Sequence, residues 1–217
     1  MSGPLFPPDF LLLLASRSPR RRDLLDAVGV PHRVIPSDGE ELGEGPVPST
    51  LAEANALSKV LSAAVPVGTA VGAFVLGADT LVVTEGRVLG KPVSGDEAAD
   101  MLVQLSGKTH QVVSGVCLAR WDGEAGRVCA HGSVATRVRF RPLEAEDVRA
   151  YLDCGEWRGK AGAYAIQGRA ALFVEGIEGD YANVVGLPLE LLGRLFREAG
   201  FDLLQRRWRE PGPGVTS

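Results

Sequence analysis

Short apolar runs alternate with helical segments along this chain, and no other pattern in the sequence limits the possible folds as strongly. Residues 11–15 are wholly apolar, which predicts a short buried strand. Ser18 and Pro19 then supply an N-cap residue and a first-turn proline, so we expect a helix that reaches about Val28. A strand, a turn and a helix therefore follow one another at the start of the predicted core.

The remaining segments predict a single α/β domain with a mixed sheet. Apolar, β-rich runs predict strands at 32–36, 71–78, 110–121, 128–141 and 170–177, and a hairpin at 81–89. Periodicity and capping residues predict helices at 49–64, 94–105, 144–153 and 188–199. Asp79 and Thr80 would lie at the tip of strand 71–78. We place the core at about 11–204 and expect flexible ends, 1–10 and 205–217.

The overall charge restricts the partners of this chain. Its 23 Lys and Arg residues against 27 Asp and Glu residues give a net charge of -4, so no global attraction to nucleic acid or anionic membranes is expected. The sequence begins without a basic segment, and the apolar run at 11–15 is too short for a signal core or membrane span. These features predict a cytoplasmic protein that binds phosphate only through a local cluster of cations.

The densest local cluster is Arg20, Arg21 and Arg22, which follow Pro19 in the first turn of the predicted helix. The N-terminal end of a helix is electrically positive, so each unpaired cation there typically costs about 0.3–1 kcal/mol. The same end offers free backbone N–H groups that bind phosphate. A bound polyphosphate would relieve the repulsion. We therefore interpret this turn as a polyphosphate site, with a solvated basic turn as the alternative.

Carboxylates and single lysines are further candidates for chemistry. Asp79 follows an apolar strand, where it could hold a divalent ion or accept a proton from water, although Asp-Thr pairs are also typical of turns. The acidic loop with Glu40 and Glu41 could bind a metal or simply be solvated. Lys59 taken alone is typical of a surface lysine, while the proline after Lys91 favours an extended backbone that directs this side chain.

Several blocks occur in the order typical of the Maf family of nucleoside triphosphate pyrophosphatases, which the chain resembles from about Leu12 to about Phe201. The blocks are Leu14-Ala15-Ser16 with Ser18-Pro19-Arg20-Arg21, Gly77-Ala78-Asp79-Thr80, Gly90-Lys91-Pro92, Leu105-Ser106-Gly107 with His110, residues 160–168 and residues 179–188. The resemblance implies a long mixed α/β sheet and two lobes with a cleft, as in inosine triphosphate pyrophosphatases. It also implies hydrolysis of a nucleoside triphosphate to the monophosphate and pyrophosphate.

The resemblance also implies roles for particular residues. Asp79 matches the family's proton acceptor, or is chiefly a metal ligand. The other implied site residues are Lys59 and Lys91 for catalysis, Ser16, Ser18, Arg20, Arg21, Thr80 and Gln167 for substrate binding, and Glu40 and Glu41 with Asp79 for metal binding. The implied cofactor is a divalent cation, Mg²⁺ or Mn²⁺, and the implied assembly is a homodimer.

The pattern from Ala161 to Gly168 is similar to the subfamily that acts on dTTP and UTP. The amide of Gln167 can donate and accept at once, which suits the imide edge of uracil or thymine. The same amide can turn to meet cytosine, so CTP stays open as a substrate. The alternative to an enzyme is a regulatory binding protein, because the family has been linked to cell-division arrest.

Overall fold

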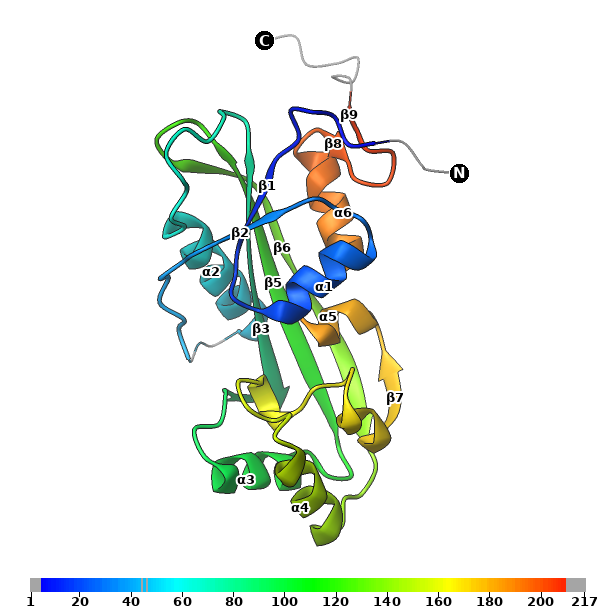
Figure 1. The fold of residues 1–217 in the computed structure, drawn as a ribbon. Coiled ribbons are helices and arrows are strands. Elements are labelled where there is room, and N and C mark those ends of the chain that lie inside the picture. Colours follow the sequence, from blue (N-terminus) through cyan, green and yellow to red (C-terminus); the bar gives the residue numbers. More distant parts are fainter. Residues whose placement is uncertain (1–4, 44, 46, 210–217) are drawn as a thin grey trace.

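The computed structural model describes residues 5–43, 45 and 47–209. Its main feature is a seven-stranded sheet with the order β2-β1-β3-β5-β6-β7, in which β4 pairs with β3. The strands are β1 (Leu12–Ala15), β2 (Arg33–Ile35), β3 (Phe74–Thr84), β4 (Arg87–Leu89), β5 (Thr109–Trp121), β6 (Gly126–Phe140) and β7 (Val174–Glu178). β1 is parallel to β2 and β3, and the other described pairs are antiparallel. Figure 1 shows an elongated sheet, so the predicted fold class is confirmed.

Helices cover both faces of this sheet. They are α1 (Pro19–Ala27), α2 (Pro48–Leu61), α3 (Gly95–Leu105), α4 (Ala145–Cys154), α5 (Tyr181–Val185) and α6 (Leu189–Glu198), with short 3₁₀ helices η1 (Ala161–Ala163) and η2 (Arg169–Phe173). In Figure 1, α2 lies on one side of the sheet and α1, α5 and α6 on the other, while α3 and α4 close one end. Among the described residues, no helix is long and apolar enough to cross a membrane.

Side-chain alternation along β1 explains how both faces become core. Leu12 and Leu14 belong to the cluster that contains Leu192 and Phe196 of α6. Leu13 and its neighbours on the opposite face pack with α2. A further cluster lies under α3 and α4 and includes, among others, Leu102, Phe140 and Tyr151. The apolar run at 11–15 is therefore a buried strand, as predicted, because both of its faces are covered.

The prediction that Asp79 and Thr80 lie at the tip of a strand is wrong. β3 continues through both residues to Thr84, because Asp79 pairs with Gly115 and Thr80 with Ser114 of β5. The strand that ends here is β1, whose last partner on β3 is Leu76. Asp79 consequently lies in the middle of β3. The neighbouring strand β1 has already ended at this level, so no strand lies beside Asp79 on that side of the sheet.

Two further segments differ from the predictions. The strand expected at 170–177 begins only at Val174, because residues 169–173 form the helix η2. The core also extends beyond the predicted limits of 11 and 204. Phe10 is 8% exposed, and Trp208 of the hairpin β8 (Phe201–Asp202) and β9 (Arg207–Trp208) stacks on Phe74. The remaining parts of the predicted flexible ends, residues 1–4 and 210–217, lie outside the described residues.

Candidate active site

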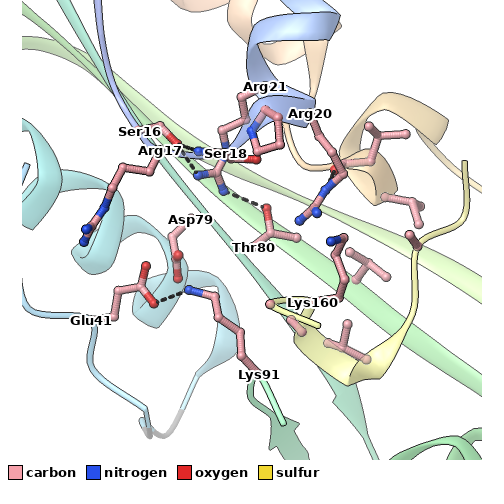
Figure 2. A pocket seen from close by; sticks show the side chains of 18 of the residues that line it. Ser16, Arg17, Ser18, Arg20, Arg21, Glu41, Asp79, Thr80, Lys91 and Lys160 are labelled. Atoms are coloured by element: carbon pink, nitrogen blue, oxygen red, sulfur yellow. Dashed lines mark hydrogen bonds and ion pairs between the residues drawn. The ribbon is translucent and has the colours of Figure 1, made fainter. Parts of the chain in front are cut away.

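A pocket of about 670 Å³ opens beside the carboxyl end of β1 and over the middle of β3. Most of the site residues predicted from the sequence line it. Its charged and polar lining includes Ser16, Arg17, Ser18, Arg20, Arg21, Glu41, Lys59, Asp79, Thr80, Lys91, Arg158, Lys160 and Gln167. Figure 2 shows that the labelled residues come from several parts of the chain: the turn from β1 into α1, the loop before α2, β3, the segment after β4 and the segment before η1. Segments that are far apart in the sequence thus share one cavity.

Two glycines allow α2 to lie close to the floor of this pocket. A Cβ atom at Gly77 of β3 or at Gly115 of β5 would collide with the backbone of α2. Because glycine has no Cβ, the helix backbone approaches the sheet closely at both points. This close approach brings Lys59 of α2 into contact with Asp79 of β3.

A chain of alternating charges runs across the pocket floor. Lys59 Nζ lies 2.7 Å from Asp79 Oδ1 and 2.8 Å from Glu41 Oε1, and it also donates to the Ala78 carbonyl. Lys91 Nζ lies 2.8 Å from Glu41 Oε2. Lys59 and Asp79 are 8% and 5% exposed, whereas Lys91 is exposed. Lys59 is therefore not the surface lysine that its sequence context suggests, because two carboxylates compensate for the cost of burying its charge.

Glu41 is held in its charged form by this arrangement. Partial burial alone would raise the pKa of the carboxyl group, but hydrogen bonds and positive charge from Lys59 and Lys91 outweigh burial and lower the pKa to about 2. At neutral pH the loop that carries Glu41 is consequently tied to both lysines.

The buried guanidinium of Arg21 is held by hydrogen bonds to three other residues. Its Nε donates to the Gly186 carbonyl at 2.8 Å, its Nη1 to Ser16 Oγ at 3.0 Å and its Nη2 to Thr80 Oγ1 at 3.2 Å. Thr80 Oγ1 also lies 2.8 Å from Ser114 Oγ. Burial lowers the pKa of Arg21, and the negative charge of Asp79 acts in the opposite direction. The predicted residues Ser16, Arg21 and Thr80 therefore form one network that joins β1, α1, β3 and the end of α5.

Arg20 faces the pocket differently. Its Nε donates to the Val185 carbonyl at 3.2 Å, and Figure 2 shows its guanidinium close to the amine of Lys160. Burial lowers the pKa of Lys160, and the positive charge of Arg20 lowers it further. Ser18 occupies the N-cap position of α1, but its side chain makes no capping hydrogen bond. Two cations that face each other across a cavity favour an anion between them.

Lys160 and Arg158 are pocket residues that were not among the predicted site residues. Both flank Gly159 in a stretch that mixes glycines with single polar residues, which was the available signal. Their cationic role could not be read from this stretch, because it depends on the proximity of α1 in the fold.

The other end of the pocket is more apolar. Val82, Val112 and Ile166 contribute to its lining, and Gln167 lies exposed at its edge. Within the described part of the chain, the Gln167 amide makes no hydrogen bond to another residue. The apolar side chains can pack against the face of a planar ring, and the Gln167 amide can hydrogen-bond to the edge of that ring.

A buried histidine supports this end from below. His110 Nε2 lies 2.8 Å from the Tyr164 hydroxyl, and the two rings meet edge to face with Phe140. Burial lowers the pKa of His110 to about 4, so the imidazole is neutral at neutral pH. His110, which belongs to one of the family sequence blocks, is therefore a core residue beneath the loop that carries Gln167.

The predicted metal ligands are only partly brought together. Glu41 and Asp79 contact the same Lys59 ammonium, whereas Glu40 is exposed and does not line the pocket. No group of three or more metal-ligating side chains occurs among the described residues. Two carboxylates nevertheless fit Mg²⁺ or Mn²⁺, because such hard cations typically bind through one or two carboxylates and the substrate phosphates. The residues that fit a divalent cation are thus Glu41 and Asp79.

Comparison with known proteins assigns this arrangement to a family. The family description "Maf-like protein" matches residues 11–199, which is most of the chain. The chain belongs to the Maf family. The match includes β1, the arginine turn, the Glu41 loop and the segment with Gln167, so the Maf region contains the whole pocket.

Curated Maf relatives cover nearly the same length. The dTTP/UTP pyrophosphatase of Symbiobacterium thermophilum is 47% identical over 88% of this chain and 95% of its own length. The dTTP/UTP pyrophosphatase of Moorella thermoacetica is 48% identical over 90% of this chain and 98% of its own length. A solved HAM1 protein from Coxiella burnetii is 14% identical and covers 87% of this chain and 99% of that chain, with a TM-score of 0.41, too low to carry an argument.

Proposed function

We propose that this Maf family chain hydrolyses dTTP and UTP to the nucleoside monophosphate and pyrophosphate. The observation that carries the proposal is the charge chain from Lys91 through Glu41 and Lys59 to Asp79, beside the arginines of α1. Such a floor can neutralise a polyphosphate and direct water at one of its phosphorus atoms. The names of relatives that are 47% and 48% identical support the same substrates.

The cations would hold the triphosphate. Arg20 and Lys160 lie close to each other at the cavity, which Lys91 also lines. Phosphate oxygens between these groups would replace like-charge repulsion with charge-assisted hydrogen bonds. Because the groups are positioned before the substrate binds, they would stabilise the negative charge that develops as pyrophosphate leaves.

Asp79 would act on the attacking water. Lys59 donates to Oδ1 of Asp79 and Asn55 to Oδ2, and the lone pairs that these donors leave free are available to the cavity. In the proposed step, water loses a proton to Asp79, its oxygen bonds to the α-phosphorus, and the bond to the bridging oxygen breaks. Pyrophosphate leaves with the electrons of that bond. Asp79 acting chiefly as a metal ligand stays open as the second assignment.

Glu41 and Asp79 would hold a divalent cation, Mg²⁺ or Mn²⁺. When bound, it would offset phosphate charge and make the attacking water more acidic. The contacts with Lys59 and Lys91 would orient the same two carboxylates before the cation binds. A metal requirement is therefore part of the proposal.

The apolar end of the pocket would receive the base. Val82, Val112 and Ile166 would pack against the pyrimidine ring, and Gln167 would meet its imide edge. Because an amide can flip its donor and acceptor, CTP stays a third candidate substrate.

The test is pyrophosphate release from dTTP, UTP, CTP, ATP and GTP, with Mg²⁺, with Mn²⁺ and with a chelator. We expect faster release from the pyrimidine nucleotides and loss of activity with the chelator. Release of single phosphates, or no release from any nucleotide with either metal, would contradict the proposal.

The regulatory alternative, a binding protein in cell-division arrest, is less well supported. A protein that only binds nucleotides has no need for a buried carboxylate paired with Lys59 beside the phosphate-binding cations. Homodimerisation and a cytoplasmic location remain predictions.

A further inference from the structure

A buried asparagine on α2 joins three parts of the candidate active site. Asn55 is 1% exposed and lies one helical turn before Lys59 on the same face of α2. Its Nδ2 donates to Asp79 Oδ2 at 2.9 Å and to the Leu42 carbonyl at 3.0 Å, while its Oδ1 accepts from the Leu42 amide at 2.8 Å. Leu42 directly follows Glu41, so this one side chain contacts both Asp79 and the Glu41 loop.

The backbone of Leu42 determines which way the Asn55 amide points. An N–H group can only donate and a carbonyl can only accept, so Oδ1 must face the Leu42 amide and Nδ2 the Leu42 carbonyl. The NH₂ group, with its second hydrogen, is therefore the part that meets Asp79. Asp79 thus has a donor on each oxygen, Asn55 on Oδ2 and Lys59 on Oδ1.

We propose that Asn55 is a positioning residue that sets the orientation of the Asp79 carboxylate and keeps the Glu41 loop against it. The inference rests on the proposed function. With both oxygens of Asp79 held from α2, its remaining lone pairs point in one direction. With Leu42 held, Glu41 remains within reach of Lys59 and Lys91. If only Lys59 held Asp79, no donor would fix the orientation of Oδ2.

Two replacements remove different sets of these hydrogen bonds. Asn55→Leu is similar in size and removes all three hydrogen bonds. Asn55→Asp keeps an acceptor for the Leu42 amide but loses both donations of Nδ2, to Asp79 Oδ2 and to the Leu42 carbonyl. Glu53→Ala is the matched control, since Glu53 is on the same helix and binds His131 and Ser133 outside the pocket.

We expect Asn55→Leu to lower kcat/KM for UTP by roughly 10- to 100-fold, the usual range for groups that orient ligands. It should also speed hydrogen exchange of the amides at 39–43 in the free protein. Asn55→Asp keeps the size of the side chain but loses the donor to Asp79 Oδ2, so it should lower kcat for UTP by a larger factor than it raises KM. Glu53→Ala should leave kcat, KM and the exchange at 39–43 unchanged.

Near wild-type kcat/KM in Asn55→Leu would overturn the proposal. It would also be overturned if Asn55→Asp raised KM and left kcat unchanged. Asn55→Asp is isosteric and carries the test alone if Asn55→Leu does not fold. A wild-type protein that releases no pyrophosphate would overturn the proposed function instead. In that case the exchange rates of the amides at 39–43 still test the positioning role. Equal rates in the Asn55 variants and in Glu53→Ala would overturn it.

Discussion

The two ends of the pocket are built differently. At the phosphate end, Arg21, Lys59 and Asp79 are buried, and each side chain is held by neighbours from another element. At the base end, Gln167 is exposed above an apolar floor that includes Val82, Val112 and Ile166. Charge chemistry needs groups that are oriented in advance, because reorientation during the reaction costs energy. Reading a base needs only a shaped surface and an adaptable amide.

The largest effect is expected at the phosphate end. Asp79→Asn keeps the shape of the side chain but removes its charge, so turnover of UTP at saturating metal should fall roughly 10²-fold or more. Thermal melts of the variant would verify that it folds. Turnover close to wild type would show that neither proton transfer nor metal binding depends on this carboxylate.

Arg20 and Arg21 offer a comparison between adjacent residues. Arg21→Ala removes three hydrogen bonds and leaves a gap among Ser16, Thr80 and Gly186, so it should lower the free energy of unfolding by roughly 2–4 kcal/mol. Arg20→Ala should leave stability nearly unchanged and weaken UTP binding by an amount that shrinks as salt is added. Denaturant unfolding and UTP titrations in a salt series measure both. Similar losses of stability in the two variants would contradict the assignment of a structural role to Arg21 and a ligand-binding role to Arg20.

The support beneath the base end can be tested with pH. The pKa of His110 is about 4 in the folded protein and about 6.5 in an unfolded chain, so the unfolded state binds the extra proton between these values. The folded protein should therefore lose about 2–3 kcal/mol of stability as pH falls from 6.5 to 4. His110→Gln, which keeps a partner for Tyr164, should flatten this part of the curve. An unchanged slope in the variant would assign the acid sensitivity to other groups.

The smallest effect is expected for base reading. Gln167→Glu keeps the length of the side chain but removes its donor, so kcat/KM for UTP and dTTP should fall about 10-fold more than for ATP and GTP. The ratio of the two rates measures base reading independently of enzyme stability. An equal loss for all four nucleotides would mean that Gln167 supports its loop instead.

Local patterns in the sequence were sufficient for most elements and for the family. The apolar run at 11–15, Pro19 in the first turn of α1 and the capping residue Ser94 each act on residues close to them in the chain, so the sequence was sufficient to identify them. The arginine turn, Asp79, Lys91 and Gln167 could be identified in the same way, because each belongs to a short block.

Only the tertiary structure decided how those residues are used. Lys59 is buried because Gly77 and Gly115 let α2 approach the sheet, and Asp79 lies within β3 because β5 continues to pair with it. The Arg21 side chain is held by hydrogen bonds to other elements, while Arg20 lines the cavity. Asn55 contacts Leu42, a loop residue thirteen positions away in the sequence. Burial, partners and electrostatic environment depend on segments that meet only in the folded chain, so adjacent residues of identical type acquire different chemistry.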